Sequence, residues 1–119
     1  MAWFAAHAVM YLKLKDEPQD NFLVWENVLL VQADTPDQAE ERAVARARED
    51  EGDSNGTLTY GDKPATWVFA GLRKVLSVAH RADSLRSGDE VTYSEFLLQD
   101  LASIQKFARG DDLEVRYVE

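Results

Sequence analysis

The alternation of hydrophobic and polar positions is clearest near the amino end of the chain. Between Trp3 and Lys15 every even position is apolar, whereas the odd positions become polar toward Lys13. A period of two is typical of a β-strand with one buried face. A polar loop, 16–21, then separates this strand from a second apolar stretch, 22–33. Two strands joined by a short polar loop predict a β-hairpin.

A helix start follows the second predicted strand. Thr35 is a preferred N-cap, Pro36 suits the first helical position, and Gln38 can close a capping box. The pattern predicts a helix that continues to about Asp50. Its inward face consists of small residues, which let a helix backbone approach a sheet closely: Ala39, Ala43, Val44 and Ala47.

The rest of the chain predicts more strands and a second, short helix. The resulting order is β-β-α-β-β-β-α-β, which favours an α+β fold. We expect an antiparallel sheet of about four to six strands, with the main helix and the short C-terminal helix on one face. The remaining predicted elements are strands over 57–60, 67–78, 90–98 and 113–118, and a helix between Asp100 and Gly110.

Composition narrows the class of protein. A length of 119 residues with 45% hydrophobic content suits one globular domain over 1–119. The absence of cysteine excludes disulfides, thiolate nucleophiles and cysteine zinc sites. A net charge of −9 argues against binding to nucleic acid or to acidic membranes. The apolar start is too short to span a bilayer and lacks a basic leader, so we expect a cytoplasmic protein.

The negative charge is concentrated in one part of the chain. Residues 34–64 carry nine acidic and four basic groups, a net charge of −5. Acidic residues at the end of the predicted helix also oppose the helix dipole. This segment is therefore the expected place for a cation or a basic partner.

The loop over 51–62 partly fits a calcium-binding template. Asp53, Asn55 and Gly56 match positions 3, 5 and 6 of an EF-hand loop. The ends of the loop do not match, and Pro64 opposes the helix that should follow. A solvated acidic loop with an Asn-Gly turn is the favoured interpretation, and calcium is the alternative.

Catalytic motifs are absent from the sequence. His7 and His80 are the two histidines, and neither belongs to a paired metal-binding motif. The sequence contains no nucleophile elbow, P-loop or dinucleotide fingerprint. We therefore expect a non-enzymatic protein with no cofactor and no metal, in which His7 is a hydrogen-bonded structural residue. An enzyme that uses Glu26 or His7 as a base is the lowest-ranked alternative.

Aromatic residues suggest a binding surface on the sheet. Trp3, His7 and Tyr11 share one face of the first strand. A sheet with helices on one side leaves its other face to a partner chain, a ligand or the protein's own loops. Glu26 and Arg73 interrupt apolar strands and are expected to form a cross-strand ion pair. The candidate binding residues are Trp3, His7, Tyr11, Trp25, Glu26, Trp67 and Tyr93.

Several short segments together resemble a known family. The first and second strands contribute Trp3-Phe4-Ala5 and Trp25-Glu26-Asn27-Val28, and the helix start contributes 33–39. The later strands contribute 67–72 and 88–93. The chain thus resembles the uncharacterised bacterial family called domain of unknown function 4288 over about residues 3–98, with 99–119 as an extension. The resemblance implies a small bacterial α+β domain and supplies no catalytic residues.

The leading functional hypothesis is a non-enzymatic protein-interaction module. It would form a homodimer through the aromatic sheet face or an edge strand, or cover a basic partner as immunity proteins cover toxic nucleases. The alternative is a small-molecule or ion-binding domain with an aromatic pocket on the sheet. That pocket would use Trp3, His7, Trp25, Glu26 and Tyr93.

Overall fold

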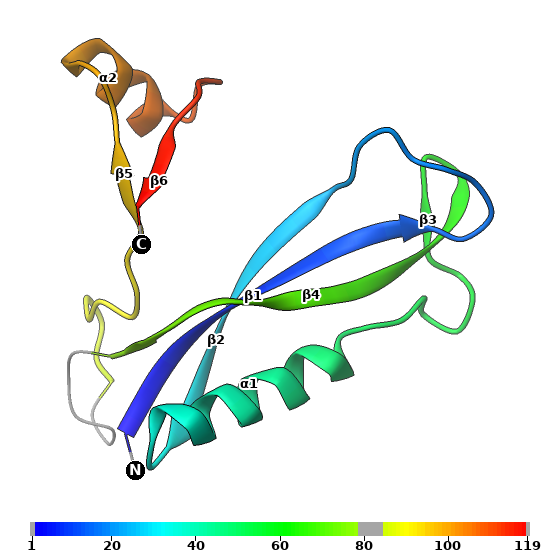
Figure 1. The fold of residues 1–119 in the computed structure, drawn as a ribbon, viewed down its shortest axis with the longest axis horizontal. Helices are drawn as coiled ribbons and strands as arrows, with labels where there is room; N and C mark the ends of the chain where they lie inside the picture. Colours follow the sequence, from blue (N-terminus) through cyan, green and yellow to red (C-terminus); the bar gives the residue numbers. More distant parts are fainter. Residues whose placement is uncertain (1, 79–84, 119) are drawn as a thin grey trace.

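A twisted antiparallel sheet with one helix across it forms the larger part of the molecule (Figure 1). The computed structural model describes residues 2–78 and 85–118. Its element order is the predicted β-β-α-β-β-β-α-β, so the α+β class is confirmed. The strands are β1 (Ala2–Leu14), β2 (Val24–Ala33), β3 (Thr59–Tyr60), β4 (Lys63–Ser77), β5 (Glu95–Leu97) and β6 (Arg116–Val118). The helices are α1 (Pro36–Glu49) and α2 (Leu101–Arg109).

The main sheet has the strand order β2-β1-β4-β3. β1 and β2 form the predicted hairpin, with register pairs from Ala2↔Ala33 to Tyr11↔Val24. β1 also pairs with β4, so it lies between two long strands. Its central position explains why both of its faces are largely buried between Phe4 and Ala8.

α1 covers one face of this sheet through the predicted stripe of small residues. The Thr35 hydroxyl caps the helix by accepting a hydrogen bond from the Gln38 backbone N–H at 3.1 Å. Ala39, Ala43 and Ala47 are each no more than 1% exposed. Ala39 and Ala47 pack against apolar residues of the sheet that include Phe4, Ala8, Met10, Phe69, Leu72 and Val75.

Two β-bulges interrupt β4 where it pairs with β1. The register shifts occur between His7 and Ala8 and between Val9 and Met10. Side chains of β4 therefore do not alternate simply between the two faces of the sheet, because each bulge inserts one extra residue. Leu72 and Val75 both face α1, so Arg73 and Lys74 together reach the opposite face.

The last described elements form a separate C-terminal unit, residues 95–118, which stands away from the main sheet (Figure 1). β5 pairs with β6, and the Phe96 ring contacts the rings of Phe107 and Tyr117. α2 thus lies with this second sheet, whereas it was expected on the same face as α1. The Asp100 carboxylate caps α2, and Gly110 ends it in the left-handed conformation, as predicted.

Within residues 2–78 and 85–118, no helix is long and apolar enough to cross a membrane. His80 lies outside the described residues. The single-domain organisation over 1–119 stays a prediction.

Candidate functional site

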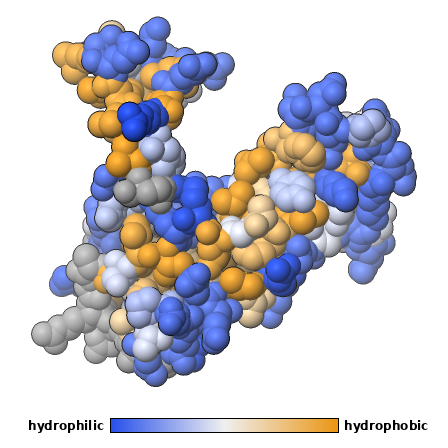
Figure 2. Space-filling model, viewed as in Figure 1, coloured by the Kyte–Doolittle hydropathy of each residue, from blue (hydrophilic) through white to orange (hydrophobic). Residues whose placement is uncertain are grey.

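The face of the main sheet opposite α1, called the open face below, combines a polar network with exposed apolar side chains. Along β2, the apolar residues Val24, Val28 and Leu30 are 54%, 43% and 41% exposed. Figure 2 shows hydrophobic residues gathered along the main sheet and again on the C-terminal unit. The open face is defined by Ala5, His7, Val9 and Tyr11 of β1 and by their partners Leu30, Val28, Glu26 and Val24 of β2.

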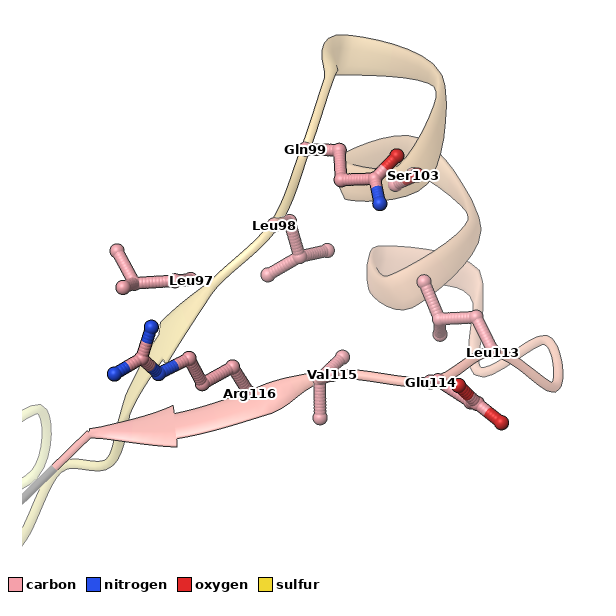
Figure 3. A pocket seen from close by; sticks show the side chains of 8 residues that line it. All are labelled: Leu97, Leu98, Gln99, Ser103, Leu113, Glu114, Val115 and Arg116. Atoms are coloured by element: carbon pink, nitrogen blue, oxygen red, sulfur yellow. The ribbon is translucent and has the colours of Figure 1, made fainter.

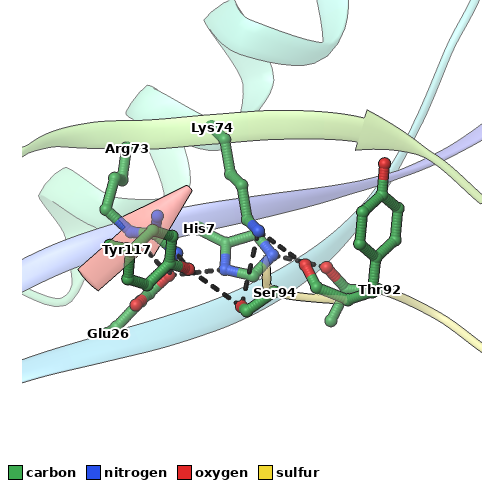
Figure 4. A network of polar contacts seen from close by, with 8 residues as sticks. His7, Glu26, Arg73, Lys74, Thr92, Ser94 and Tyr117 are labelled. Carbon is green, nitrogen blue, oxygen red and sulfur yellow. Dashed lines mark hydrogen bonds and ion pairs between the residues drawn. The ribbon is translucent and has the colours of Figure 1, made fainter. Parts of the chain in front are cut away.

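His7 is the buried centre of the polar network (Figure 4). Its side chain lies between Glu26 on β2 and Thr92, with the residue only 2% exposed. Nδ1 is 2.6 Å from Glu26 Oε1, and Nε2 is 2.5 Å from Thr92 Oγ1. An ionised carboxylate only accepts hydrogen bonds, so Nδ1 carries a proton. In the neutral imidazole, Nε2 then accepts the Thr92 hydroxyl proton.

Arg73 and Lys74 extend the network toward the C-terminal unit. Arg73 Nε donates to Glu26 Oε1 at 3.0 Å, which confirms the expected ion pair. The same guanidinium contacts the Tyr117 hydroxyl and lies 3.8 Å from the centre of its ring. Lys74 Nζ donates to the Tyr93 carbonyl oxygen at 2.5 Å. The first bulge makes this possible because it directs two consecutive cations to one face.

The electrostatics of the network favour an ionised Glu26. Partial burial alone would raise the pKa of this carboxyl, but hydrogen bonds from Arg73 and His7 outweigh it. The positive charge of Arg73 acts in the same direction, and the net pKa is lowered below 4.5. Glu26 therefore stays charged at neutral pH and holds both partners.

The order of hydroxyl, imidazole and carboxylate in this network has the form of a nucleophile-activating triad. Three features oppose that use. The Glu26 oxygen on His7 is shared with Arg73, and the imidazole is covered. The neighbouring hollow, lined in part by Lys74 and Tyr93, holds about 70 Å³, well below an ordinary ligand pocket. The contacts are better suited to holding the segment around Thr92 against β1 and β2 than to binding a substrate.

An apolar groove lies on the open face beside the network. It has a volume of about 400 Å³. The Tyr11 and Phe22 rings meet edge to face in it, with their centres 5.6 Å apart. Its lining is Val9, Tyr11, Phe22, Val24, Ala70 and one cationic residue, Lys13.

The predicted aromatic surface is divided between the two faces of the sheet. Trp25 is paired with Met10, and Trp67 with Leu12, so both tryptophans lie on the α1 face. Their ring centres are 4.7 Å apart, with 45° between the planes. The expectation of one continuous aromatic face is therefore wrong. Alternation orders the residues within a strand, whereas the register between strands decides which faces coincide.

Of the two other predicted site residues, Trp3 lies apart from these clusters and Tyr93 lies at the edge of the polar network. Trp3 is half-buried near the start of β1, opposite Gln32. Tyr93 is 51% exposed, and its ring centre lies 5.5 Å from Lys74 Nζ. Of the predicted set, His7, Glu26 and Tyr93 thus belong to the network or its edge, and Tyr11 lines the groove.

The acidic loop over 51–62 leads into a strand. Asp53 is ion-paired with Lys15 and also accepts the Gly56 backbone N–H at 3.0 Å. These two hydrogen bonds, the one from Lys15 first, lower the pKa of Asp53. In the described ranges, no group of three or more His, Asp or Glu side chains is placed to hold a metal. A basic partner for the acidic face of α1 stays a prediction.

The C-terminal unit has a hollow of its own, of about 610 Å³ (Figure 3). Leu98, Leu113 and Val115 surround the space between β5, α2 and β6. None of the residues of α2 is buried. The remaining lining residues are Leu97, Gln99, Ser103, Glu114 and Arg116.

The sequence-based set of site residues omitted five members of the network: Arg73, Lys74, Thr92, Ser94 and Tyr117. The sequence contained an indication for Lys74, because it is the one charged residue among the apolar even positions of 67–78. Thr92 lies 85 residues from His7 and has no local signal of its own.

Comparisons with known proteins identify the family. Neither the comparison with curated proteins nor the comparison with solved structures found a match. A match to one family model covers residues 3–94, which include the main sheet, α1 and Thr92, and ends just before β5. The chain therefore belongs to the family described as domain of unknown function 4288 (DUF4288).

Proposed function

We propose that this chain is a non-enzymatic protein-interaction module that works as a homodimer, with the open face as the contact surface. The observation that carries the proposal is the row of Val24, Val28 and Leu30 along β2, each more than 40% exposed beside the apolar groove. Clusters of exposed apolar side chains mark interaction surfaces more often than scattered ones do.

A second copy of the chain is the occupant that the surfaces support best. The C-terminal unit exposes Leu101, Ile104 and Phe107 of α2 by 69%, 48% and 39%. One copy therefore offers both an exposed apolar groove on the sheet and an exposed amphipathic helix. In a two-fold dimer each α2 would cover the groove of the other copy, so both surfaces would be buried twice.

The overall dimensions support the same conclusion. The radius of gyration is 17.3 Å, whereas a compact chain of this length has a radius of about 14 Å. The long strands of the main sheet and the projecting C-terminal unit both extend the molecule (Figure 1).

The absence of an enzymatic role is supported by the state of the polar network. The His7 ring is covered and both ring nitrogens are engaged by Glu26 and Thr92. The hydrogen bonds join β1, β2 and the segment around Thr92. This is the expected behaviour of a structural histidine.

Size-exclusion chromatography with light scattering tests the proposal. The wild-type chain should elute with the mass of a dimer, and Val28→Asp should shift it to monomer because a charge is placed in the contact. Ala45→Asp is the control, since it adds the same charge to the exposed side of α1 and should leave the dimer intact. A wild-type chain that is monomeric at every concentration would contradict the proposal, as would a dimer unaffected by Val28→Asp.

A further inference from the structure

The face of the sheet that α1 only partly covers has a second hollow, called the tryptophan site below. It has a volume of about 190 Å³ and lies beyond the last turn of α1. That volume is smaller than an ordinary small-molecule pocket, so it suits a single head group or side chain. Its lining consists of Met10, Trp25, Asn27, Asp50 and Trp67.

The two indole rings come from strands on either side of β1. Their centres are 4.7 Å apart and their planes make an angle of 45°, so they are tilted and not stacked flat. Trp25 is 51% exposed although it lies beside Trp67 and Met10. A large aromatic side chain left half in water beside a hollow presents a π surface to a ligand.

The wall of the tryptophan site next to these rings is negative. Asp50 is the C-cap of α1, where the helix dipole places partial negative charge. Glu49 and Glu51 flank it in the chain. The exposed guanidinium of Arg46 pairs with Asp50 at 3.3 Å, and such surface pairs are weak enough to be exchanged for another cation.

The position of this wall is fixed by the backbone. Gly52 donates its N–H to the Trp67 carbonyl at 3.1 Å and accepts the Trp67 N–H at 2.8 Å. Glu51 Oε2 accepts the backbone N–H of Phe69 at 2.8 Å. The end of α1 is therefore attached directly to the strand that carries one of the rings. Pre-formed sites of this kind need little ordering when a ligand binds.

We propose that the tryptophan site binds an alkylated ammonium group, such as a trimethylammonium head group. Aromatic faces attract cations, and adjacent rings that surround a quaternary ammonium are a known form of this interaction. The methyl groups would contact Met10 and the indole rings, while Asp50 supplies the opposite charge. An alkylated ammonium also needs few hydrogen-bond acceptors, and the lining of the site has few.

A metal ion is a poorer fit to the same hollow. Hard cations require several oxygen ligands, and the described residues contain no group of three or more His, Asp or Glu side chains suited to a metal. The proposal also explains why acidic residues occupy the end of α1 where they oppose the dipole. A bound cation would offset that repulsion.

This site is independent of the proposed dimer. The open face lies on the other side of the sheet. Light scattering therefore tests the dimer, and ligand titration tests the tryptophan site. A dimer that binds no cation would overturn only the proposed tryptophan site. A monomer that binds the cation would overturn only the proposed homodimer.

Tetramethylammonium and choline are the first probes, with tryptophan fluorescence and calorimetry as the readouts. Both cations should give a saturable response. The neutral isostere 3,3-dimethyl-1-butanol has the shape of choline without its charge, and should bind about tenfold more weakly if the cation–π interaction operates. Equal binding of choline and this alcohol, or no saturable response to either cation, would overturn the proposal.

Two variants locate the binding. Trp25→Ala should reduce the affinity for tetramethylammonium about tenfold or more, and Asp50→Asn should reduce it severalfold. Glu49→Gln is the matched control: it removes one exposed charge from the same helix end, and Glu49 is not part of the lining. Its affinity should stay within about twofold of the wild type. Circular dichroism confirms folding of each variant. Equal loss in Glu49→Gln and Asp50→Asn would show a general charge effect and contradict the site.

The alkylated ammonium can come from a free small molecule or from a trimethylated lysine side chain. A short peptide with trimethyl-lysine, compared with the same peptide carrying unmodified lysine, separates these sources. Choline binding without peptide binding assigns a small-molecule ligand. Preference for the trimethylated peptide assigns a modified protein. Failure of choline, tetramethylammonium and the trimethylated peptide alike overturns the proposal.

Discussion

His7 Nδ1 lies 2.6 Å from Glu26 Oε1, and the same carboxylate oxygen accepts a hydrogen bond from Arg73 Nε at 3.0 Å. Glu26 is on β2, His7 on β1 and Arg73 on β4, which are the three neighbouring long strands. One carboxylate therefore links the edge strand β2 to its neighbour β1 and to β4 on the far side of β1. The His7 side chain is 3% exposed and that of Glu26 is 33% exposed, so water screens this link only in part.

Glu26→Gln should destabilise the protein at neutral pH by about 1–2 kcal/mol. Glutamine keeps the size of the side chain, but it removes the charge that Arg73 and His7 contact. The partial exposure of Glu26 limits the loss, because water can solvate the two partners. Urea unfolding followed by circular dichroism measures the change. A variant as stable as the wild type would show that the carboxylate charge does not hold the strands.

The stability difference between wild type and Glu26→Gln should depend on pH. The pKa of Glu26 is lowered in the folded protein from a value of 4.5, so the unfolded chain binds its proton first as the pH falls. The contribution of the Glu26 charge to the free energy of unfolding is complete above pH 4.5. It is lost as the pH falls through the lower pKa of Glu26 in the folded protein. The gap between the two proteins should therefore shrink in acid. A gap that is constant through this range would contradict the prediction.

Thr92→Val should cost about 1–3 kcal/mol of stability, because it leaves Nε2 of a buried histidine without its hydroxyl partner. Valine has nearly the same shape as threonine, so the change removes the 2.5 Å contact to His7 and little packing. Thermal or urea unfolding gives the value. Thr59→Val on β3 is the control, since Thr59 is exposed and should change stability by less than about 0.5 kcal/mol.

The elements that the sequence predicted correctly are those with local causes. The alternation in β1 follows from the period of a strand, and the Thr35 cap depends on residues within four positions. The position of α2 was predicted wrongly. Its amphipathic pattern indicates a helix with one apolar side, but any apolar surface can meet that side. In this chain α2 lies with the β5–β6 sheet, and several of its apolar residues stay exposed.

The candidate site was harder to predict than the fold. The pairing of Glu26 with Arg73 was accessible, because two opposite charges interrupt apolar strands. The bulges of β4 could not be predicted, since a bulge is defined only by the pairing with the neighbouring strand. The same dependence on register placed Trp25 on the face of α1. Contacts between distant segments, such as Thr92 with His7, leave no pattern in either segment alone.

Ala43→Leu should destabilise the protein by about 1–3 kcal/mol, because the larger side chain forces α1 away from the sheet. Ala43 is 0% exposed, in the middle of the stripe with Ala39 and Ala47. Ala45→Leu is the matched control on the exposed side of the same helix, and it should change stability by less than about 0.5 kcal/mol. Equal stability of the two variants would show that the α1 interface has room for larger residues.

Tyr117→Phe should loosen the C-terminal unit without unfolding the main sheet. The Tyr117 hydroxyl accepts a hydrogen bond from Arg73 and donates one to Ser94 Oγ at 2.8 Å, which joins β6 to the family domain. Phenylalanine keeps the ring contact with Phe96, so the unit should stay folded and lose only its attachment.

Amide hydrogen exchange measures this effect strand by strand. Protection of β5 and β6 should fall by about tenfold, which corresponds to a net loss of about 1.4 kcal/mol for the two hydrogen bonds of the hydroxyl. Protection of β1 should not change, because its hydrogen bonds to β2 and β4 are not touched. Tyr60→Phe, at an exposed residue of β3, should leave exchange unaltered throughout. Unchanged protection of β6 in Tyr117→Phe would mean that ring contacts alone hold the unit in place.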